Sequence, residues 1–247
     1  MAMTDEQAEL VPDERRPSPF ALLFAPDRSM DRQARVGRTL GILLFAWLCS
    51  LLLAGALAYR VDAQAATLQK LETSGELNNM SDRQVADETR KADRLFQVKA
   101  VAKGVLGPPL DLGLASLGLV GLGWFLRGRI KAKAVAPIAA ATLLPGSIAT
   151  LLDAASAYRH ASIAPEGTSL APRTLTALLQ VAGHPLAGAW AKLGNTLDFY
   201  SLWAAVIMAL GVAAAGKIPT RRALIGTAVG WVCYRLLTQV AIGGMTS

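Results

Sequence analysis

Three charged residues lie within or beside long apolar stretches of this chain. Asp111 is the only charge in residues 105–126, Arg235 is the only charge in residues 223–244, and Asp198 directly precedes the uncharged residues 199–216. In a membrane, a charge near the centre of a helix costs at least ~2.5 kcal/mol, so it pairs with an opposite charge or faces a wet cavity. One hypothesis is that Asp111 and Arg235, with Asp198 nearer the surface, form a polar site for moving a proton or a substrate. Two alternatives stay open: Arg235 extends to the interface, or the pair only locks two helices together.

The sequence lacks the patterns that carry enzymatic chemistry. It contains no HExxH, GxSxG, GxxxxGK[ST] or paired-cysteine motif, and the glycine-rich LGLASLGLVGLG of residues 112–123 has no following Lys-Ser/Thr. His160 and His184 have no carboxylate at ligand spacing, and Cys49 and Cys233 are typical small core residues. We therefore expect no catalytic residue, no metal and no cofactor, and we do not interpret the chain as an enzyme.

Five apolar stretches are available to position the polar residues. Of the 247 residues, 53% are hydrophobic and 17% are charged, and the mean hydropathy is +0.37. A membrane-spanning helix needs roughly 20 mostly apolar residues. The prediction is an all-α, polytopic integral membrane bundle, rather than a soluble bundle with long buried helices, and its five spans lie at about 40–59, 105–126, 134–152, 199–216 and 223–243.

The ends of two spans need separate comment. About 39 residues precede the first span, and a cleaved signal peptide has a much shorter leading region, so we expect an uncleaved anchor. Pro108-Pro109 resists a regular helix because proline lacks the backbone N–H and clashes with the preceding turn. We expect the second span to begin or to kink there.

The basic residues indicate an orientation. The net charge is +7, and the bases cluster in three segments that share one side of a five-span topology. Cytoplasmic loops are enriched in Lys and Arg, which predicts a cytoplasmic N-terminus and an extracytoplasmic C-terminus. This distribution favours a lipid partner and not nucleic acid. The three clusters are Arg28, Arg32, Arg35 and Arg38; Arg127, Arg129, Lys131 and Lys133; and Lys217, Arg221 and Arg222.

The segments between and before the spans also have predictable roles. Residues 1–19 are expected to be a disordered cytoplasmic tail, and residues 20–38 a basic interfacial segment or a plain tether. Residues 61–103 are expected to form an extracytoplasmic helical hairpin whose second helix opens with a Ser81–Gln84 capping box. Residues 173–193 are expected to form two short helices at the outer interface. A re-entrant segment or a sixth span over residues 174–191 is the alternative.

Small residues recur at helical spacing within the spans. Such rows let membrane helices approach closely, within one chain, between two copies, or against other membrane proteins. The rows used here are Ala46, Ser50, Ala54 and Ala58 in the first span and Gly226 and Gly230 in the fifth.

The arrangement of these features resembles the Yip-one domain family of five-span membrane proteins, in its bacterial branch. The resemblance extends over residues 20–241. It begins with an inner segment, FALLFAPDRSM, and its most specific part is the last two spans. The matching positions are Leu197, Asp198, Phe199, Trp203, Leu210, Gly211, Arg221, Arg222, Ala223 and Trp231.

The resemblance implies a non-catalytic scaffold or adaptor that acts in membrane organisation, trafficking or support of a transport complex. It also implies a bacterial cytoplasmic membrane location and other membrane proteins as partners. Eukaryotic relatives carry Asp-Leu-Tyr-Gly-Pro, whereas Asp111-Leu112-Gly113 lacks the Tyr and Pro, so GTPase binding is not carried over. The alternative function is a transporter or channel component that uses the Asp111 and Arg235 region.

Overall fold

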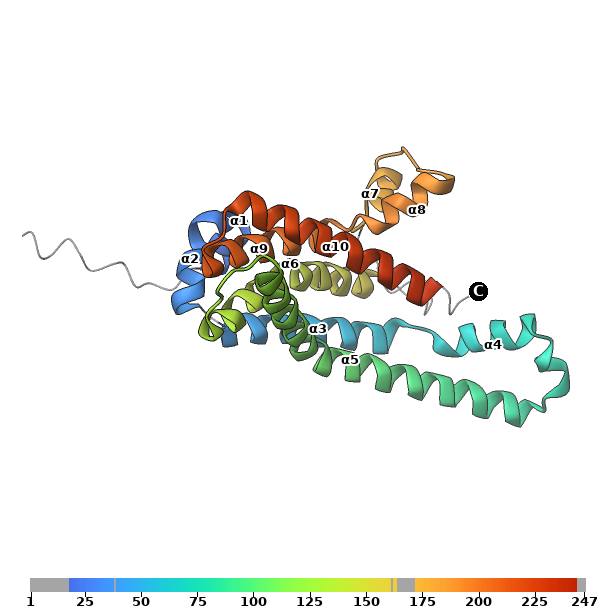
Figure 1. Ribbon diagram of the computed structural model, residues 1–247. Coiled ribbons are helices and arrows are strands. Elements are labelled where there is room, and N and C mark those ends of the chain that lie inside the picture. Colours follow the sequence, from blue (N-terminus) through green and yellow to red (C-terminus); the bar gives the residue numbers. More distant parts are fainter. Residues whose placement is uncertain (1–17, 38, 161, 164–171, 244–247) are drawn as a thin grey trace, which may run out of the picture.

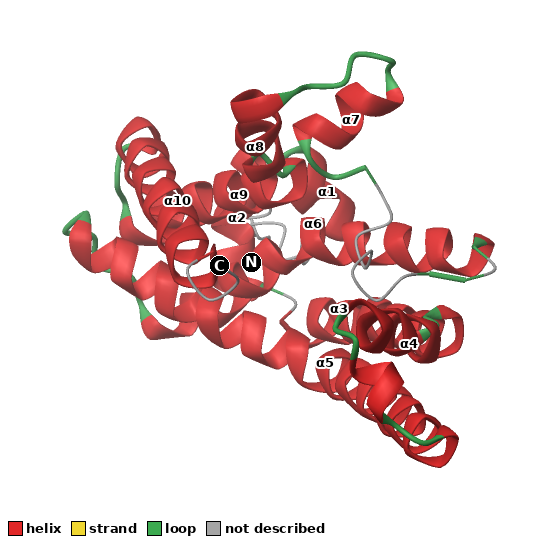
Figure 2. Ribbon diagram, turned by 90° about the vertical axis from the view of Figure 1, so that its right-hand side faces the viewer, coloured by secondary structure: helices red, strands yellow, loops and turns green. Residues whose placement is uncertain are grey.

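The computed structural model describes the whole chain except residues 1–17, 38, 161, 164–171 and 244–247. Over the described residues the fold is entirely helical, without a strand (Figures 1 and 2). The predicted tail therefore lies outside the described residues, apart from Ser18 and Pro19. Ser18 is the N-cap of α1, and Pro19 is its first residue.

Four helices in the described part of the chain are long and apolar enough to cross a membrane. They are α3 (Thr39–Arg60), α5 (Asp82–Phe125), α6 (Ala132–Arg159) and α9 (Phe199–Gly216). The predictions of an all-helical fold and of membrane-length helices in these four places are confirmed. The fifth predicted span coincides with α10 (Thr220–Gly243), which is not one of the four.

Helix α6 is the centre of the bundle. It packs against α3, α5 and α9, and α10 lies outside it, against α9 and α5. Ile138 and the three alanines that follow it are fully buried. Close approach is possible because α9 presents Gly211 to α6: a Cβ at this position would lie 2.1 Å from Ile138 Cγ2.

Helix α5 does not begin at Pro108-Pro109, because it already starts at Asp82; the alternative, a kink at the prolines, stays a prediction. It is a single helix of 44 residues, capped at its start by the predicted box, in which the Ser81 N–H donates to Gln84 Oε1 at 2.9 Å. Pro109 has no N–H to give to the Val105 carbonyl one turn earlier. The Trp47 indole N–H of α3 donates to this Val105 oxygen instead, at 2.6 Å. A neighbouring helix thus satisfies the carbonyl that the proline leaves free, which allows the helix to continue.

The first part of α5 and the helix α4 (Ala63–Thr73) form an arm beyond the end of α3, joined by the short helix η2 (Glu76–Asn79). Gly104 of α5 faces Ala54 of α3, where an added Cβ would lie 2.8 Å from the Ala54 Cβ. Since α3 ends six residues later, at Arg60, residues 82–98 of α5 extend about 25 Å past it at 1.5 Å per residue.

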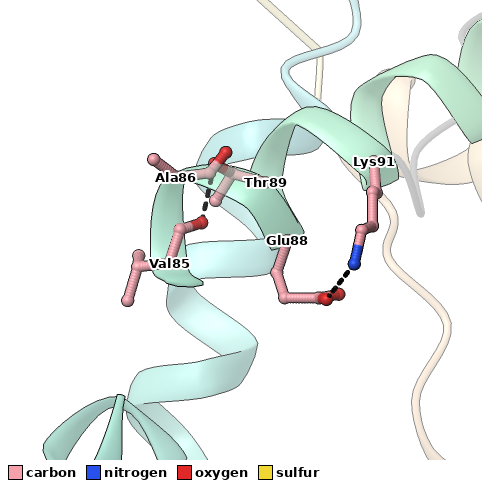
Figure 3. Close-up of polar contacts among 5 residues, drawn as sticks. All are labelled: Val85, Ala86, Glu88, Thr89 and Lys91. Carbon is pink, nitrogen blue, oxygen red and sulfur yellow. Dashed lines mark hydrogen bonds and ion pairs between the residues drawn. The ribbon is translucent and has the colours of Figure 1, made fainter. Parts of the chain in front are cut away.

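The surface of the arm is polar and locally bonded (Figure 3). Lys91 Nζ lies 2.8 Å from Glu88 Oε1, and this hydrogen bond raises the pKa of the Lys91 ammonium. The Thr89 hydroxyl donates back to Val85 O at 3.0 Å, so this buried polar group is satisfied within its own helix. The arm is therefore a helical pair whose outer face is suited to water.

The remaining short helices lie at the two ends of the bundle (Figures 1 and 2). Helices α1 (Pro19–Phe24) and α2 (Pro26–Val36) lie at the end that carries the α5–α6 and α9–α10 turns, with α2 packed on α6 and α9. Helices α7 (Leu175–Val181) and α8 (Gly188–Thr196) stand at the other end. Neither α7 nor α8 approaches the roughly 20 residues that a span requires.

Candidate functional site

A polar cavity of 260 Å³ lies between α3, α5, α6 and α9. Asp111 of α5 and Asp198 at the start of α9 both line it, so the structure brings together two of the three predicted polar residues. The third charged residue at the cavity is Arg173, from the segment before α7. The rest of the polar lining consists of the hydroxyl residues Ser50, Thr142, Ser147, Thr150, Tyr200 and Ser201.

Asp198 has a defined structural role at the edge of this cavity. It is the N-cap of α9: its Oδ1 accepts hydrogen bonds from the Tyr200 N–H at 2.8 Å and the Ser201 N–H at 3.2 Å. A helix leaves its first backbone N–H groups unpaired, and a carboxylate there also interacts favourably with the helix dipole. Asp198 therefore fixes the start of α9 and at the same time presents negative charge to the cavity.

The arginine at the site is held by a carboxylate that the sequence analysis did not select. The Arg173 guanidinium forms an ion pair with Asp153 near the end of α6, and the Asp153 side chain is 1% exposed. Burial lowers the pKa of Arg173, and the negative charge of Asp198 opposes that shift. A guanidinium stays charged in proteins, so this pair carries both charges into the edge of the bundle.

Backbone pairing places Arg173 beside Asp198. The Phe199 N–H donates to Arg173 O and the Leu175 N–H donates to Leu197 O, both at 3.0 Å. These bonds form an isolated antiparallel bridge between Thr174 and Asp198. The segment that contains α7 and α8, here called the α7–α8 excursion, is thus joined where it begins and ends. This pairing brings Arg173 to the mouth of the cavity.

The hydroxyl groups present acceptors to the cavity. Thr142, Ser147 and Thr150 donate their hydroxyl protons to carbonyls within α6, at 2.7, 2.8 and 2.9 Å. Their proton is therefore committed, and the lone pairs of the oxygen remain for other groups. Together with Asp111 and Asp198, these oxygens give the cavity hydrogen-bond acceptors and negative charge, while Arg173 supplies positive charge among the described lining residues.

Arg235 is not placed at this cavity by the described residues. Its backbone lies on α10, and its side chain is outside the described residues, so the expected pairing with Asp111 stays a prediction.

The other positions of the family resemblance lie on two neighbouring helices. Phe199, Trp203 and Gly211 are on α9, and Trp231 is on α10.

The rows of small residues serve contacts inside the chain wherever their packing is described. Ala46 and Ala54 are buried, while Ser50 lines the cavity and Ala58 is partly exposed. On α10, a Cβ at Gly226 would lie 2.8 Å from Leu126 Cδ2, and one at Gly230 would lie 3.6 Å from Leu122 Cδ2.

Sequence reasoning missed Asp153 and Arg173 for an identifiable reason. Asp153 directly follows residues 134–152, the predicted third span, so the sequence pattern places it just outside that span. The helix actually continues to Arg159, which puts Asp153 inside it. The sequence did contain one signal that singles out Arg173: it is the only arginine between Arg159 and Arg221.

In the described part of the chain, no three His, Cys, Asp or Glu side chains are grouped so as to hold a metal ion. Comparison of the chain with protein-family models, curated proteins and solved structures found no match.

Proposed function

We propose that this chain is a non-catalytic membrane scaffold or adaptor of the Yip-one type, in a bacterial cytoplasmic membrane. In this proposal α10 is a fifth span, the N-terminus is cytoplasmic and the C-terminus is extracytoplasmic. The basic clusters support this orientation, because the turns that carry them lie at one end of the bundle (Figure 1). The α5–α6 and α9–α10 turns touch there: a Cβ on Gly128 would lie 2.4 Å from Ile218 Cδ1.

The observation that carries the proposal is the continuity of α5. One unbroken helix belongs to the bundle at one end and to the arm at the other. A scaffold needs a rigid connection between its membrane part and the surface that a partner binds, and an α-helix supplies it. In the proposed orientation the arm is extracytoplasmic.

The arm also offers a surface to bind. A groove of 690 Å³ runs between α4 and α5, lined by Leu95 and Phe96, by small residues, and by the longer polar side chains of Gln69, Lys70 and Lys99. Leu95 is 54% exposed and Val98 is 65% exposed. Exposed apolar side chains beside a groove are typical of protein interaction sites, so we assign partner docking to this groove.

Site-specific photocrosslinking in cells tests the scaffold role. A photoreactive amino acid in place of Leu95 should crosslink a defined membrane protein, whereas the same substitution at Arg90, exposed on the same helix, should not. The variant Leu95→Glu should abolish copurification of that protein in mild detergent, and Arg90→Glu should preserve it. Equal crosslinking at both positions, or at neither, would contradict the proposal.

The polar cavity favours a second candidate function, a component that moves protons or small cations. The observation behind it is the oxygen-rich lining with Asp111 and Asp198. Full-length chain in liposomes should then dissipate an imposed proton or sodium gradient, and Asp111→Asn should remove this activity while leaving the copurified partner in place. A wild-type chain that moves neither ion would leave the scaffold proposal alone.

A further inference from the structure

A second groove, at the opposite end of the bundle from the arm, has the chemistry of a lipid site. It encloses 720 Å³ between α2, the start of α6 and the end of α9. Its floor is apolar and includes Leu210, Ala213 and Ala214. Its rim is basic: Arg35, Lys131, Lys133 and Lys217 line it, against two acidic residues, Asp27 and Asp31.

The four basic side chains are free to bind an anion. In the described part of the chain, none of them has a carboxylate within ion-pair distance, although Asp27 and Asp31 line the same groove. Elsewhere in the protein, a lysine close to an acid does pair, as Lys91 does with Glu88. The rim therefore offers unneutralised positive charge directly above an apolar floor.

Lys217 provides a second, independent observation. It adopts a left-handed backbone conformation, with φ 53°, as the C-cap of α9. Glycine adopts this conformation without penalty, whereas a side chain costs stability. A lysine at this position is therefore not explained by the turn alone, and its side chain lines the groove. An outlier of this kind is a reason to look for function in the side chain.

We infer that this groove binds an anionic phospholipid, with the phosphate at the basic rim and an acyl chain along the apolar floor. Four helices are long and apolar enough to cross a membrane, and in a bilayer such a lipid is the available ligand with both features. Basic pockets between membrane helices bind anionic head groups in the same way. The inference holds whether or not the chain acts as a scaffold, since it uses neither the arm nor the cavity.

Native mass spectrometry of the full chain tests the inference. The purified protein in mild detergent is mixed with phosphatidylglycerol and phosphatidylcholine that have identical acyl chains. The wild type should retain phosphatidylglycerol preferentially. The triple variant Lys131→Gln, Lys133→Gln, Lys217→Gln should lose this preference, at roughly fivefold per neutralised lysine. No head-group preference in the wild type would overturn the inference.

Two glycine substitutions separate lipid binding from folding. Lys217→Gly removes the steric cost of the left-handed conformation and the basic side chain together, so the melting midpoint should not fall while phosphatidylglycerol retention does. Arg127 is the matched control: it has the same conformation, with φ 56°, at the other basic turn, and it does not line the groove. Arg127→Gly should therefore preserve retention. Equal loss in both variants would contradict the inference.

A soluble anion distinguishes a lipid from free phosphate. Glycerol phosphate carries the head-group charge without acyl chains, so it should not displace phosphatidylglycerol at equal concentration. Displacement by glycerol phosphate would mean that the rim binds phosphate alone, and the lipid assignment would be wrong.

Discussion

At the scale of single residues, polar side chains in this bundle form hydrogen bonds with backbone groups that have no partner within their own helix. Trp47 supplies a donor where Pro109 has none, and Asp198 accepts the first N–H groups of α9. An unpaired backbone group costs several kcal/mol in a medium without water. The polar residues of the bundle are therefore placed by backbone needs as well as by any function of the cavity.

Replacing Trp47 with phenylalanine should destabilise the protein by about 1 kcal/mol, the usual net value of one hydrogen bond. In a Pro109→Ala background the same change should cost less, because residue 109 then has an N–H for Val105 O. The measurement is the free energy of unfolding in mixed micelles for all four combinations. Equal costs in the two backgrounds would show that the indole bond does not compensate for the proline.

Removing Arg173 should be more costly. Arg173→Met leaves the Asp153 carboxylate, 1% exposed, without its ion-pair partner, and breaking a buried pair costs about 3 kcal/mol or more. The double variant Arg173→Met, Asp153→Leu should recover most of this loss. The control is Arg159→Met, which changes an exposed arginine at the end of α6, the helix that carries Asp153. A double variant as unstable as the single one would refute the pairing argument.

At the scale of elements, the bundle depends on how closely α9 approaches α6. The side chain of Ile138 fills the space in which a residue other than glycine at position 211 would place its Cβ. Helices in lipid associate mainly through such close packing, because the lipid solvates apolar side chains as well as a neighbouring helix does. Gly211 is thus a packing residue of this chain.

Gly211→Ala should destabilise the protein by about 1–3 kcal/mol, the usual cost of overpacking a core. Gly113→Ala is the matched control, because no atom outside its own helix lies within 4 Å of the added Cβ. That substitution should be neutral or slightly stabilising. Thermal unfolding followed by tryptophan fluorescence would compare the two. Equal effects at the two positions would contradict the packing argument.

At the scale of the whole molecule, the two ends of the bundle differ in chemistry. One end collects the basic turns and the amphipathic α2, and the other carries the arm and the base of the α7–α8 excursion (Figure 1). In the proposed topology this basic end is cytoplasmic, as the positive-inside bias predicts. This assignment makes a direct prediction about labelling.

Single cysteines test the orientation in a background in which Cys49 and Cys233 are replaced by alanine. A membrane-impermeant maleimide should label Asn78→Cys, at the tip of the arm, in intact cells. It should label Arg129→Cys and Arg221→Cys only after the membrane is opened. Labelling of either arginine position in intact cells would invert or abolish the proposed topology.

The helices could be predicted from local features of the sequence. Long uncharged stretches and helical spacing of apolar residues are local properties, so the predicted bounds 199–216 coincide with α9 and 40–59 fall within α3. The predicted helix start at Pro108-Pro109 was wrong, because the donor for the free Val105 carbonyl comes from Trp47, 58 residues before Val105 in the chain. Nothing near the prolines in the sequence signals that donor.

Which charges share a site depends on tertiary packing, and it could not be predicted from the sequence. Asp111 and Asp198 were recognisable as exceptions within or beside apolar stretches, but the arginine beside them is Arg173, brought there by the short backbone pairing at the base of the α7–α8 excursion. The basic groove is likewise made by three separate segments: α2, the start of α6 and the end of α9. Hydropathy and spacing describe each segment alone, whereas a site depends on which segments become neighbours, and long-range packing sets that.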